Sequence, residues 1–142
     1  MSCTKSFTIL PNSLTNNYVF KELTKQFFDQ NSFITNSFRY YTKRPYTVIE
    51  NHIYTALYYV DQNCIGYGHL DKDGETVWLG IAVSQHGQGN GFGTKIMKDL
   101  TYNYSSQITL SVDRDNVKAI NLYQKFNFKT VDEFKNYFIM KN

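Results

Sequence analysis

Cysteine and proline are both scarce, with two residues of each among the 142 in the chain. The cysteines, Cys3 and Cys64, lie far apart, and no Cys-x-x-Cys pair or Cys/His cluster accompanies them. This pattern excludes a disulfide framework and the usual structural metal sites. We therefore expect no bound metal.

Long apolar runs are absent as well. No segment approaches the roughly 18 apolar residues of a membrane-spanning helix. The first ten residues, MSCTKSFTIL, lack the apolar core of a secretion signal. We expect a soluble cytoplasmic protein that binds no membrane.

Charge of either sign is weak. The formal net charge is +3, and the chain has no run of Lys or Arg. A nucleic-acid-binding protein would carry a basic patch or stripe, so nucleic acid is not an expected partner. Hydrophobic residues make up 42% and aromatic residues 17%, which is enough for the core of a single domain over 1–142. The sequence leaves both a monomer and a homodimer open.

Apolar periodicity predicts an α+β chain. Strands are expected at 6–10, 53–60, 65–71, 75–83 and 107–112, with two more within 128–140. Helices are expected at 13–29, 32–42, 92–104 and 117–126, with Ser13 capping the first and Pro45 ending the second. The three central strands form an antiparallel meander with a tight turn at 72–74. This order favours a mixed sheet with helices around it.

Three glycines recur at every second position in QGNGFG, residues 88–93. The stretch follows an apolar strand that ends at Val83, and it opens a helix. Amides at a helix N-terminus are unpaired and partly positive, and glycine removes the Cβ that would keep a phosphate away from them. The pattern therefore predicts a pyrophosphate cradle. It fits neither a Walker loop, because Gly93-Thr94-Lys95 has the wrong order, nor a dinucleotide fingerprint, because the glycine spacing differs.

A third phosphate-binding motif fits well. Gln88-x-x-Gly91-x-Gly93 resembles the acetyl-CoA motif of the GNAT (Gcn5-related N-acetyltransferase) superfamily. Residues 116–128, NVKAINLYQKFNF, are similar to that superfamily's second motif, N-x-x-A-x-x-L-Y-x-K-x-G-F. Asn127 replaces the usual Gly, and Asn is the next-best residue for a left-handed helix end. The two motifs cover 76–128, and the element order covers nearly the whole chain.

The resemblance implies a fold and an activity. The fold is the GNAT fold, an α+β (α/β sandwich) arrangement with a central mixed, mostly antiparallel sheet flanked by helices. The activity is an N-acetyltransferase reaction that uses acetyl-CoA as co-substrate and no metal.

The resemblance also implies the residues that bind acetyl-CoA. The backbone of Ile81, Ala82 and Val83 should lie along the pantetheine arm. The residues expected to hold the pyrophosphate are Gln88, Gly89, Asn90, Gly91, Phe92, Gly93 and Thr94. Asn116 can cap the helix that follows it, as Asn does well, and the family also places this residue near the CoA arm. The two roles are compatible.

Tyr123 stands where the family has its general acid. Attack of an amine on a thioester expels a thiolate, and a positioned Tyr hydroxyl can protonate that sulfur. Tyr123 is therefore the catalytic candidate that the resemblance favours most. The alternative interpretation is a core tyrosine on a helix face.

The general base remains open. Histone-type GNATs carry a Glu where this chain has Val77, and ribosomal-protein N-terminal acetyltransferases carry one where it has Ser111. The candidates nearby are His69, Glu75, His52 and Asp71. A histidine has the right intrinsic pKa for this role. His69 lies beside Val77 if 72–74 is a three-residue turn, and it faces Trp78 if 73–74 is a two-residue turn. Proton transfer through water, with no dedicated base, is a further possibility.

The acceptor is expected to be a small-molecule amine. The segment 38–46, FRYYTKRPY, places Arg39, Lys43 and Arg44 among aromatic residues, which suits a nucleotide diphosphate and its base. Segments around 50–55, 66–71 and 78–81 are similar to small GNAT enzymes that acetylate amino sugars for surface polysaccharides. We therefore expect a nucleotide-linked amino sugar, of the UDP- or dTDP-4-amino-4,6-dideoxyhexose type, acetylated by direct transfer in a ternary complex.

Two other functions stay open. The first is acetylation of a protein N-terminus, a lysine or a polyamine, which an acidic groove would favour. The second belongs to a different class, namely a non-catalytic module that binds acyl-CoA, because a fold alone does not imply catalysis.

Overall fold

The structure is a computed structural model that describes residues 6–142, so Cys3 lies outside the described residues. Seven strands form one sheet in the order β1-β2-β3-β4-β5-β7-β6. They are β1 (Phe7–Pro11), β2 (Tyr54–Val60), β3 (Asn63–Asp73), β4 (Thr76–Val83), β5 (Thr109–Asp113), β6 (Lys129–Glu133) and β7 (Tyr137–Lys141). Every neighbouring pair is antiparallel except β4 and β5, which confirms the predicted mixed sheet.

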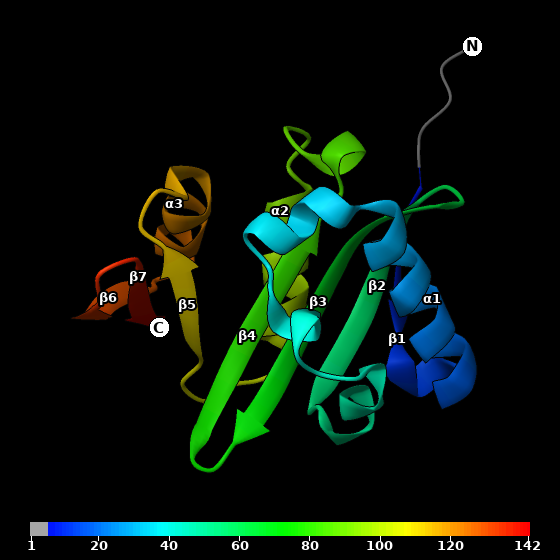
Figure 1. Cartoon of the computed structure of the whole chain (residues 1–142), viewed down its shortest axis with the longest axis horizontal. Coiled ribbons are helices and arrows are strands. Elements are labelled where there is room, and N and C mark those ends of the chain that lie inside the picture. The colour runs from blue at the N-terminus through cyan, green and yellow to red at the C-terminus, as the bar shows by residue number, and fades with distance from the viewer. Residues whose placement is uncertain (1–5) are drawn as a thin grey trace.

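Helices cover both faces of this sheet (Figure 1). Helix α1 (Asn17–Gln30) lies on one face, where Phe20 and Phe27 pack with Leu57 of β2 and Tyr67 of β3. Helices α2 (Phe92–Tyr102) and α3 (Val117–Lys125) pack into the core of the opposite face. Each buried aliphatic or aromatic side chain contributes about 1.5–3 kcal/mol, so the two cores fix the faces of the central strands.

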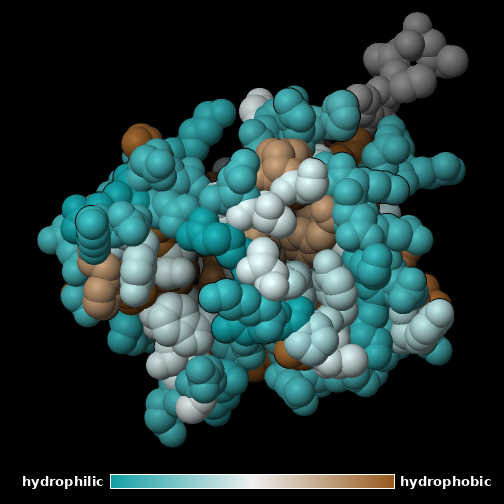
Figure 2. Space-filling model, viewed as in Figure 1, coloured by the Kyte–Doolittle hydropathy of each residue, from teal (hydrophilic) through white to brown (hydrophobic). Residues whose placement is uncertain are grey.

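The polarity of the surface is consistent with the burial of apolar side chains in the two cores. Figure 2 shows a largely hydrophilic face, with apolar surface gathered near its centre. Within residues 6–142, no helix combines the length and the apolar composition needed to cross a membrane.

The predicted first helix starts later than expected. Ser13 lies in a short 3-10 turn, η1 (Asn12–Leu14), and α1 begins at Asn17. Its cap is Asn16, whose Oδ1 accepts hydrogen bonds from the amides of Tyr18 (2.8 Å) and Val19 (3.2 Å). Asn caps a helix as well as Ser does, and here the side chain of Asn16 satisfies two unpaired amides.

The predicted second helix, 32–42, is wrong. The segment forms two short 3-10 turns, η2 (Ser32–Asn36) and η3 (Tyr40–Thr42), and a third, η4 (Tyr46–Asn51), follows Pro45. The hydroxyls of Thr35 and Thr42 donate to backbone carbonyls three residues earlier, at 2.8 and 2.7 Å. Such local bonds compete with the α-helical pattern.

The turn between β3 and β4 follows neither register that the sequence suggested. Asp73 pairs with Thr76, so the two loop residues are Gly74, with φ +60°, and Glu75. Glycine first in a two-residue loop is the pattern of a type II′ turn. As a result, His69 pairs with Gly80 rather than with Val77 or Trp78. Val77 packs in the α2 core, on the opposite face from His69, so the expected contact between them is wrong.

Candidate active site

Strands β4 and β5 diverge, as Figure 1 shows, and a cleft lies beside β4 where they separate. The two strands pair in parallel at Trp78 and Thr109. Strand β4 continues to Val83 with β3 along its other edge. Residues 80–83 therefore present backbone N–H and C=O groups that have no strand partner on the β5 side within residues 6–142. The space beside them, about 270 Å³, reaches from β4 to α3 and to the loop before α2.

The glycine-rich loop forms one end of this cleft. Gly89 and Gly91 have φ values of +79° and +77°, which an L side chain rarely adopts, and Gly91 is the N-cap of α2. Within residues 6–142, the amides of 89–94 have no hydrogen-bond acceptor. These free amides at a helix N-terminus, on a backbone without side chains at 89 and 91, suit a phosphate group.

Most residues predicted to bind the cofactor line this cleft. They are Ile81, Ala82, Val83, Gln88, Gly89, Gly91, Phe92, Gly93, Asn116 and Tyr123. Thr94 and Asn90 are not among the lining residues, and the Asn90 amide group donates to the carbonyls of His86 and Gln88 instead. Asn116 also caps α3, since its Oδ1 accepts from the Ala119 amide at 3.3 Å. The capping role and the place in the cleft are therefore compatible.

A second pocket, of about 520 Å³, meets the cleft at Tyr123. Ser37, Ile81, Asn116 and Tyr123 line both spaces. Tyr123 is 7% exposed, and burial raises the pKa of its hydroxyl, which keeps the proton on the oxygen. Within the described residues, its hydroxyl has no side-chain partner. The arrangement leaves an available phenol proton where the two spaces join.

His69 forms part of the wall of this second pocket. The ring is 2% exposed, and its Nδ1 lies 2.6 Å from the hydroxyl of Tyr67, which lies 2.5 Å from that of Tyr41. The other ring nitrogen faces Gly80, where a Cβ atom, if the residue had one, would stand 2.5 Å from Nε2. Burial, with help from His52 and Arg44, lowers the pKa of His69 well below its usual value. The imidazole is therefore neutral at pH 7.

A second histidine stands beside the first. The rings of His52 and His69 have centroids 4.7 Å apart. The Tyr40 hydroxyl donates to Asp71 Oδ2 at 2.8 Å and lies 2.8 Å from His52 Nε2. Because that hydroxyl has a single proton, His52 Nε2 donates to it, and His52 Nδ1 accepts from Thr55 at 2.7 Å. Burial lowers the pKa of His52 to about 4.

The candidate bases therefore differ in their access to the pocket. His69 and Asp71 line it, whereas His52 reaches it through Tyr40. Glu75 lies in the exposed β3–β4 turn and is not among the lining residues. Within the described residues, Nε2 of His69 has no hydrogen-bond partner, and the residue is almost fully buried at the pocket wall, so His69 is the base that the geometry favours.

The three basic side chains of the segment 38–46 have different surroundings and do not form one cluster. Arg39 forms a two-pronged ion pair with Asp113, at 2.8 and 3.2 Å. Lys43 is not among the pocket residues. Arg44 lines the pocket, with its guanidinium 4.4 Å from the Tyr40 ring centroid, and no carboxylate lies within ion-pair distance among residues 6–142.

Several residues of the two spaces were not among the site residues predicted from the sequence. Ala119 and Leu122 line the cleft beside β4 and belong to the second motif, so the sequence held a signal for them. Tyr40, Tyr41 and Tyr67 come from segments whose relative positions the sequence does not encode locally. Only the tertiary fold brings their hydroxyls to the two histidines.

The sequence also matches a known protein family. The profile of the "Acetyltransferase (GNAT) family" matches residues 17–128. The chain belongs to that family.

Individual relatives are more distant. A probable spermine N(1)-acetyltransferase from Bacillus subtilis subsp. natto is 36% identical over 69 residues, which are 44% of this chain and 45% of that protein. The match thus spans less than half of that relative. An N-acetyltransferase from Staphylococcus aureus Mu50 has a TM-score of 0.72 at 17% identity, over 96% of this chain and 98% of that one. Campylobacter jejuni N-acetyltransferase PseH, in complex with acetyl coenzyme A, has a TM-score of 0.63 at 16% identity, over 96% and 98%. These two similarities concern the fold.

Proposed function

We propose that this chain transfers the acetyl group of acetyl-CoA to a primary amine, and that the amine belongs to a nucleotide-linked amino sugar. One observation carries the proposal. The cleft beside the free edge of β4 and the pocket lined by His69 meet at Tyr123. A donor in the first space and an acceptor in the second would have their reacting atoms beside a buried acid and a buried base.

The residues of the cleft fit acetyl-CoA. The unpaired edge at 81–83 suits the amide groups of a pantetheine arm, and the free amides of 89–94 suit a pyrophosphate. Acetyl-CoA supplies the activated acyl group as a thioester. A backbone amide near 81–83 would polarise the thioester carbonyl.

The chain's own residues then account for the protons. The amine nitrogen forms the new bond to the acyl carbon as the carbon–sulfur bond breaks, and His69 Nε2 accepts the proton that the nitrogen loses. For that step the neutral His69 has its ring proton on Nδ1, and this N–H donates a hydrogen bond to the Tyr67 oxygen. Tyr123 delivers a proton to the departing sulfur. After the step His69 holds one extra proton and Tyr123 lacks one. Exchange with water returns both residues to their starting protonation states.

The pocket chemistry supports a sugar nucleotide as acceptor. Hydroxyl groups of Ser37, Tyr40 and Ser111 can bond to sugar hydroxyls, and Trp78 adds an aromatic wall. Arg44 lies at the pocket without a carboxylate partner among the described residues, so it is available to a diphosphate.

A polyamine is the second candidate. Two observations favour it: the partial match to the probable spermine acetyltransferase, and the carboxylates of Asp71 and Asp73 in the pocket. A cationic acceptor would be attracted by these carboxylates and repelled by Arg44.

The two candidates predict opposite effects of one substitution. Thiol release from acetyl-CoA would be measured with UDP- and dTDP-linked 4-amino-4,6-dideoxyhexoses, with spermine and spermidine, and with short peptides. For a sugar nucleotide, Arg44→Ala raises KM about tenfold or more, the loss expected for a charge-assisted contact. For a polyamine, the same change leaves KM unaltered or lowers it. Lys43→Ala is the matched control, because it removes a neighbouring charge that is not at the pocket.

The outcomes separate the functions. Turnover with a sugar nucleotide, together with the Arg44 effect, supports the proposal. Turnover with polyamines or peptides alone refutes the acceptor but keeps the transferase. No thiol release with any amine, while acetyl-CoA still raises the Tm, contradicts the enzyme and favours the acyl-CoA-binding module.

A further inference from the structure

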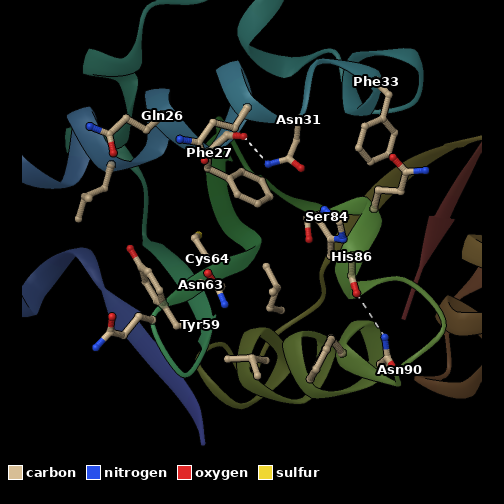
Figure 3. A pocket seen from close by; sticks show the side chains of 17 residues that line it. Gln26, Phe27, Asn31, Phe33, Tyr59, Asn63, Cys64, Ser84, His86 and Asn90 are labelled. Atoms are coloured by element: carbon tan, nitrogen blue, oxygen red, sulfur yellow. Dashed lines mark hydrogen bonds between the residues drawn. The ribbon is translucent and has the colours of Figure 1, made fainter. Parts of the chain in front are cut away.

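A third and larger space lies outside the two just described. It is a groove of about 900 Å³ between α1, the hairpin of β2 and β3, and the loop before α2 (Figure 3). Neither His69 nor Tyr123 lines it. We propose that this groove is a second ligand site, specific for an uncharged saccharide, and that its occupation strengthens acetyl-CoA binding. The second half of the proposal rests on the proposed acetyl-CoA site.

Among the residues that the structure describes, almost none of the side chains at the groove is charged. None of its 17 lining residues is Asp, Glu, Lys or Arg, although such residues make up 19% of the chain. Its ionisable side chains are those of His86, Tyr59 and Cys64, and burial raises the pKa of the Cys64 thiol to about 11, which keeps it neutral. A charged ligand would lose hydration here without gaining a countercharge. The groove therefore selects against ions.

Many of the side chains that line the groove are neutral carboxamides. Seven of the 17 lining residues are Asn or Gln, against 14 Asn and 7 Gln in the 142 residues of the chain. Five of them make no side-chain hydrogen bond within residues 6–142: Gln26, Gln30, Gln62, Asn63 and Gln85. Each offers two N–H donors and one carbonyl acceptor. All five are exposed, so water can bond to them in the free protein. An apolar ligand would displace that water without replacing its hydrogen bonds, whereas neighbouring hydroxyls would satisfy both donor and acceptor.

Aromatic side chains complete the wall. Tyr59 and Phe33, which Figure 3 labels on opposite sides of the groove, lie among the carboxamides, and Phe27 lies between them. Rings of this kind pack against the C–H faces of a sugar. The volume is within the range of small-molecule sites. Polar groups of both kinds beside aromatic faces are what an uncharged saccharide needs.

An extended peptide fits less well. The strands at the groove, β2 and β3, are both internal to the sheet, since β1, β2, β3 and β4 pair in succession. Their backbone groups are therefore occupied, and no free edge is available for a peptide to join as a strand.

One loop connects the groove to the acetyl-CoA cleft. Ser84, Gln85, His86 and Asn90 face the groove, whereas Gly87, Gln88, Gly89 and Gly91, from the same segment, line the cleft. Phe33 and Phe92 line both spaces. A saccharide that fixes the groove side of this loop also fixes the amides on the other side. Coupling between two such sites is reciprocal, so each ligand tightens the other.

The test measures binding rather than turnover. Glucose, galactose, N-acetylglucosamine, maltotriose and cellotriose would be titrated into the ¹⁵N-labelled protein, with acetyl-Ala-Ala-Ala-amide as the neutral peptide. We expect at least one saccharide to shift the side-chain amide signals of Gln26, Gln30 and Gln62. At saturation, the calorimetric Kd of acetyl-CoA should fall about fivefold.

Exposed residues supply the variants. The double variant Gln30→Ala/Gln62→Ala should weaken saccharide binding at least tenfold and leave acetyl-CoA binding without sugar unchanged. Gln107→Ala, an exposed glutamine outside the groove, is the control and should alter neither.

Four results would overturn the proposal, in part or whole. Absence of any saccharide-induced shift, or shifts with the peptide alone, would refute the ligand class. Competition between saccharide and acetyl-CoA would assign the groove to the cofactor, and an unchanged acetyl-CoA Kd would refute the coupling. Because no amine acceptor is present, failure here is distinct from failure of the proposed reaction.

Discussion

Replacement of Gly80 by alanine tests the placement of the proposed base. A Cβ at position 80 would lie 2.5 Å from His69 Nε2, 2.6 Å from its Cε1 and 2.9 Å from Phe38 Cε2. Ordinary contacts begin at 3.4 Å, so the imidazole would have to retreat by about 1 Å. The ring is 2% exposed and its Nδ1 is held by Tyr67, so this retreat disturbs a packed site.

Both stability and catalysis should respond. Overpacking of this kind costs about 1–3 kcal/mol of unfolding free energy. A displacement of about 1 Å at a reacting group lowers kcat by roughly 100-fold. The acetyl-CoA Kd should stay within twofold of the wild-type value, because the new methyl group meets His69 and Phe38 in the second pocket rather than the cleft beside β4. Urea unfolding, thiol release with the accepted amine, and calorimetry measure the three quantities.

Gly74→Ala is the matched control for Gly80→Ala. Gly74 has φ +60° and open space around its Cβ position, so alanine there costs about 1–2 kcal/mol of backbone strain without touching the site. Its kcat should equal that of the wild type. A Gly80→Ala protein that also kept full kcat would refute the assignment of His69, whatever its stability.

Three further predictions concern the loop, the relay and the acid response. Gly91→Ala, at φ +77°, should raise the acetyl-CoA Kd about tenfold, because the free loop would relieve about 1–2 kcal/mol of strain by leaving the conformation that presents its amides, and an unchanged calorimetric Kd would contradict the phosphate cradle. Tyr67→Phe removes the partner of His69 Nδ1, so kcat should fall and its pH profile should shift, while acetyl-CoA binding persists. The folded-state pKa values of His52, at about 4, and of His69 lie below the unfolded value of 6.5, so the unfolded chain binds more protons as pH falls. Unfolding free energy should therefore decrease from pH 6.5 towards pH 4, by roughly 3 kcal/mol for His52 alone, and His52→Gln should flatten this slope in urea titrations.

The cleft where we propose that acetyl-CoA binds was more predictable than the pocket lined by His69, for a physical reason. Apart from three residues of the segment 33–37, its residues come from β4, from the loop and the first turn of α2 that follow it, and from α3 with its cap. Local spacing in QGNGFG and NVKAINLY therefore already describes most of the surface. A glycine with positive φ and an Asn cap are local properties that a sequence states directly.

The pocket lined by His69 depends on contacts between distant segments. Tyr40, His52 and Asp71 lie in three separate segments of the chain, and no local spacing in the sequence relates their side chains to one another. The β3–β4 turn includes Glu75 rather than Asp73, and this shift in register moves the partner of His69 to Gly80. A strand's side chains alternate between faces, so small errors in register change which groups meet.

The segment 32–51 illustrates a further limit. Its aromatic and apolar residues suggested a helix, yet side-chain hydroxyls and Pro45 divide it into short 3-10 turns. These turns place Phe38 and Tyr40 against His69, with ring centroids 5.9 and 4.4 Å away. A continuous helix would not bring both rings to that position, since residues two apart lie on different faces of a helix.

The most direct test of the central claim is a comparison of Tyr123→Phe with the wild type. The change removes one oxygen at the point where the cleft and the pocket meet, and it keeps the ring that packs near Phe128. Loss of a general acid should lower kcat by about 100-fold or more, with the acetyl-CoA Kd and the Tm nearly unchanged. An unaltered kcat, or an equal loss of kcat and acetyl-CoA affinity, would contradict the account.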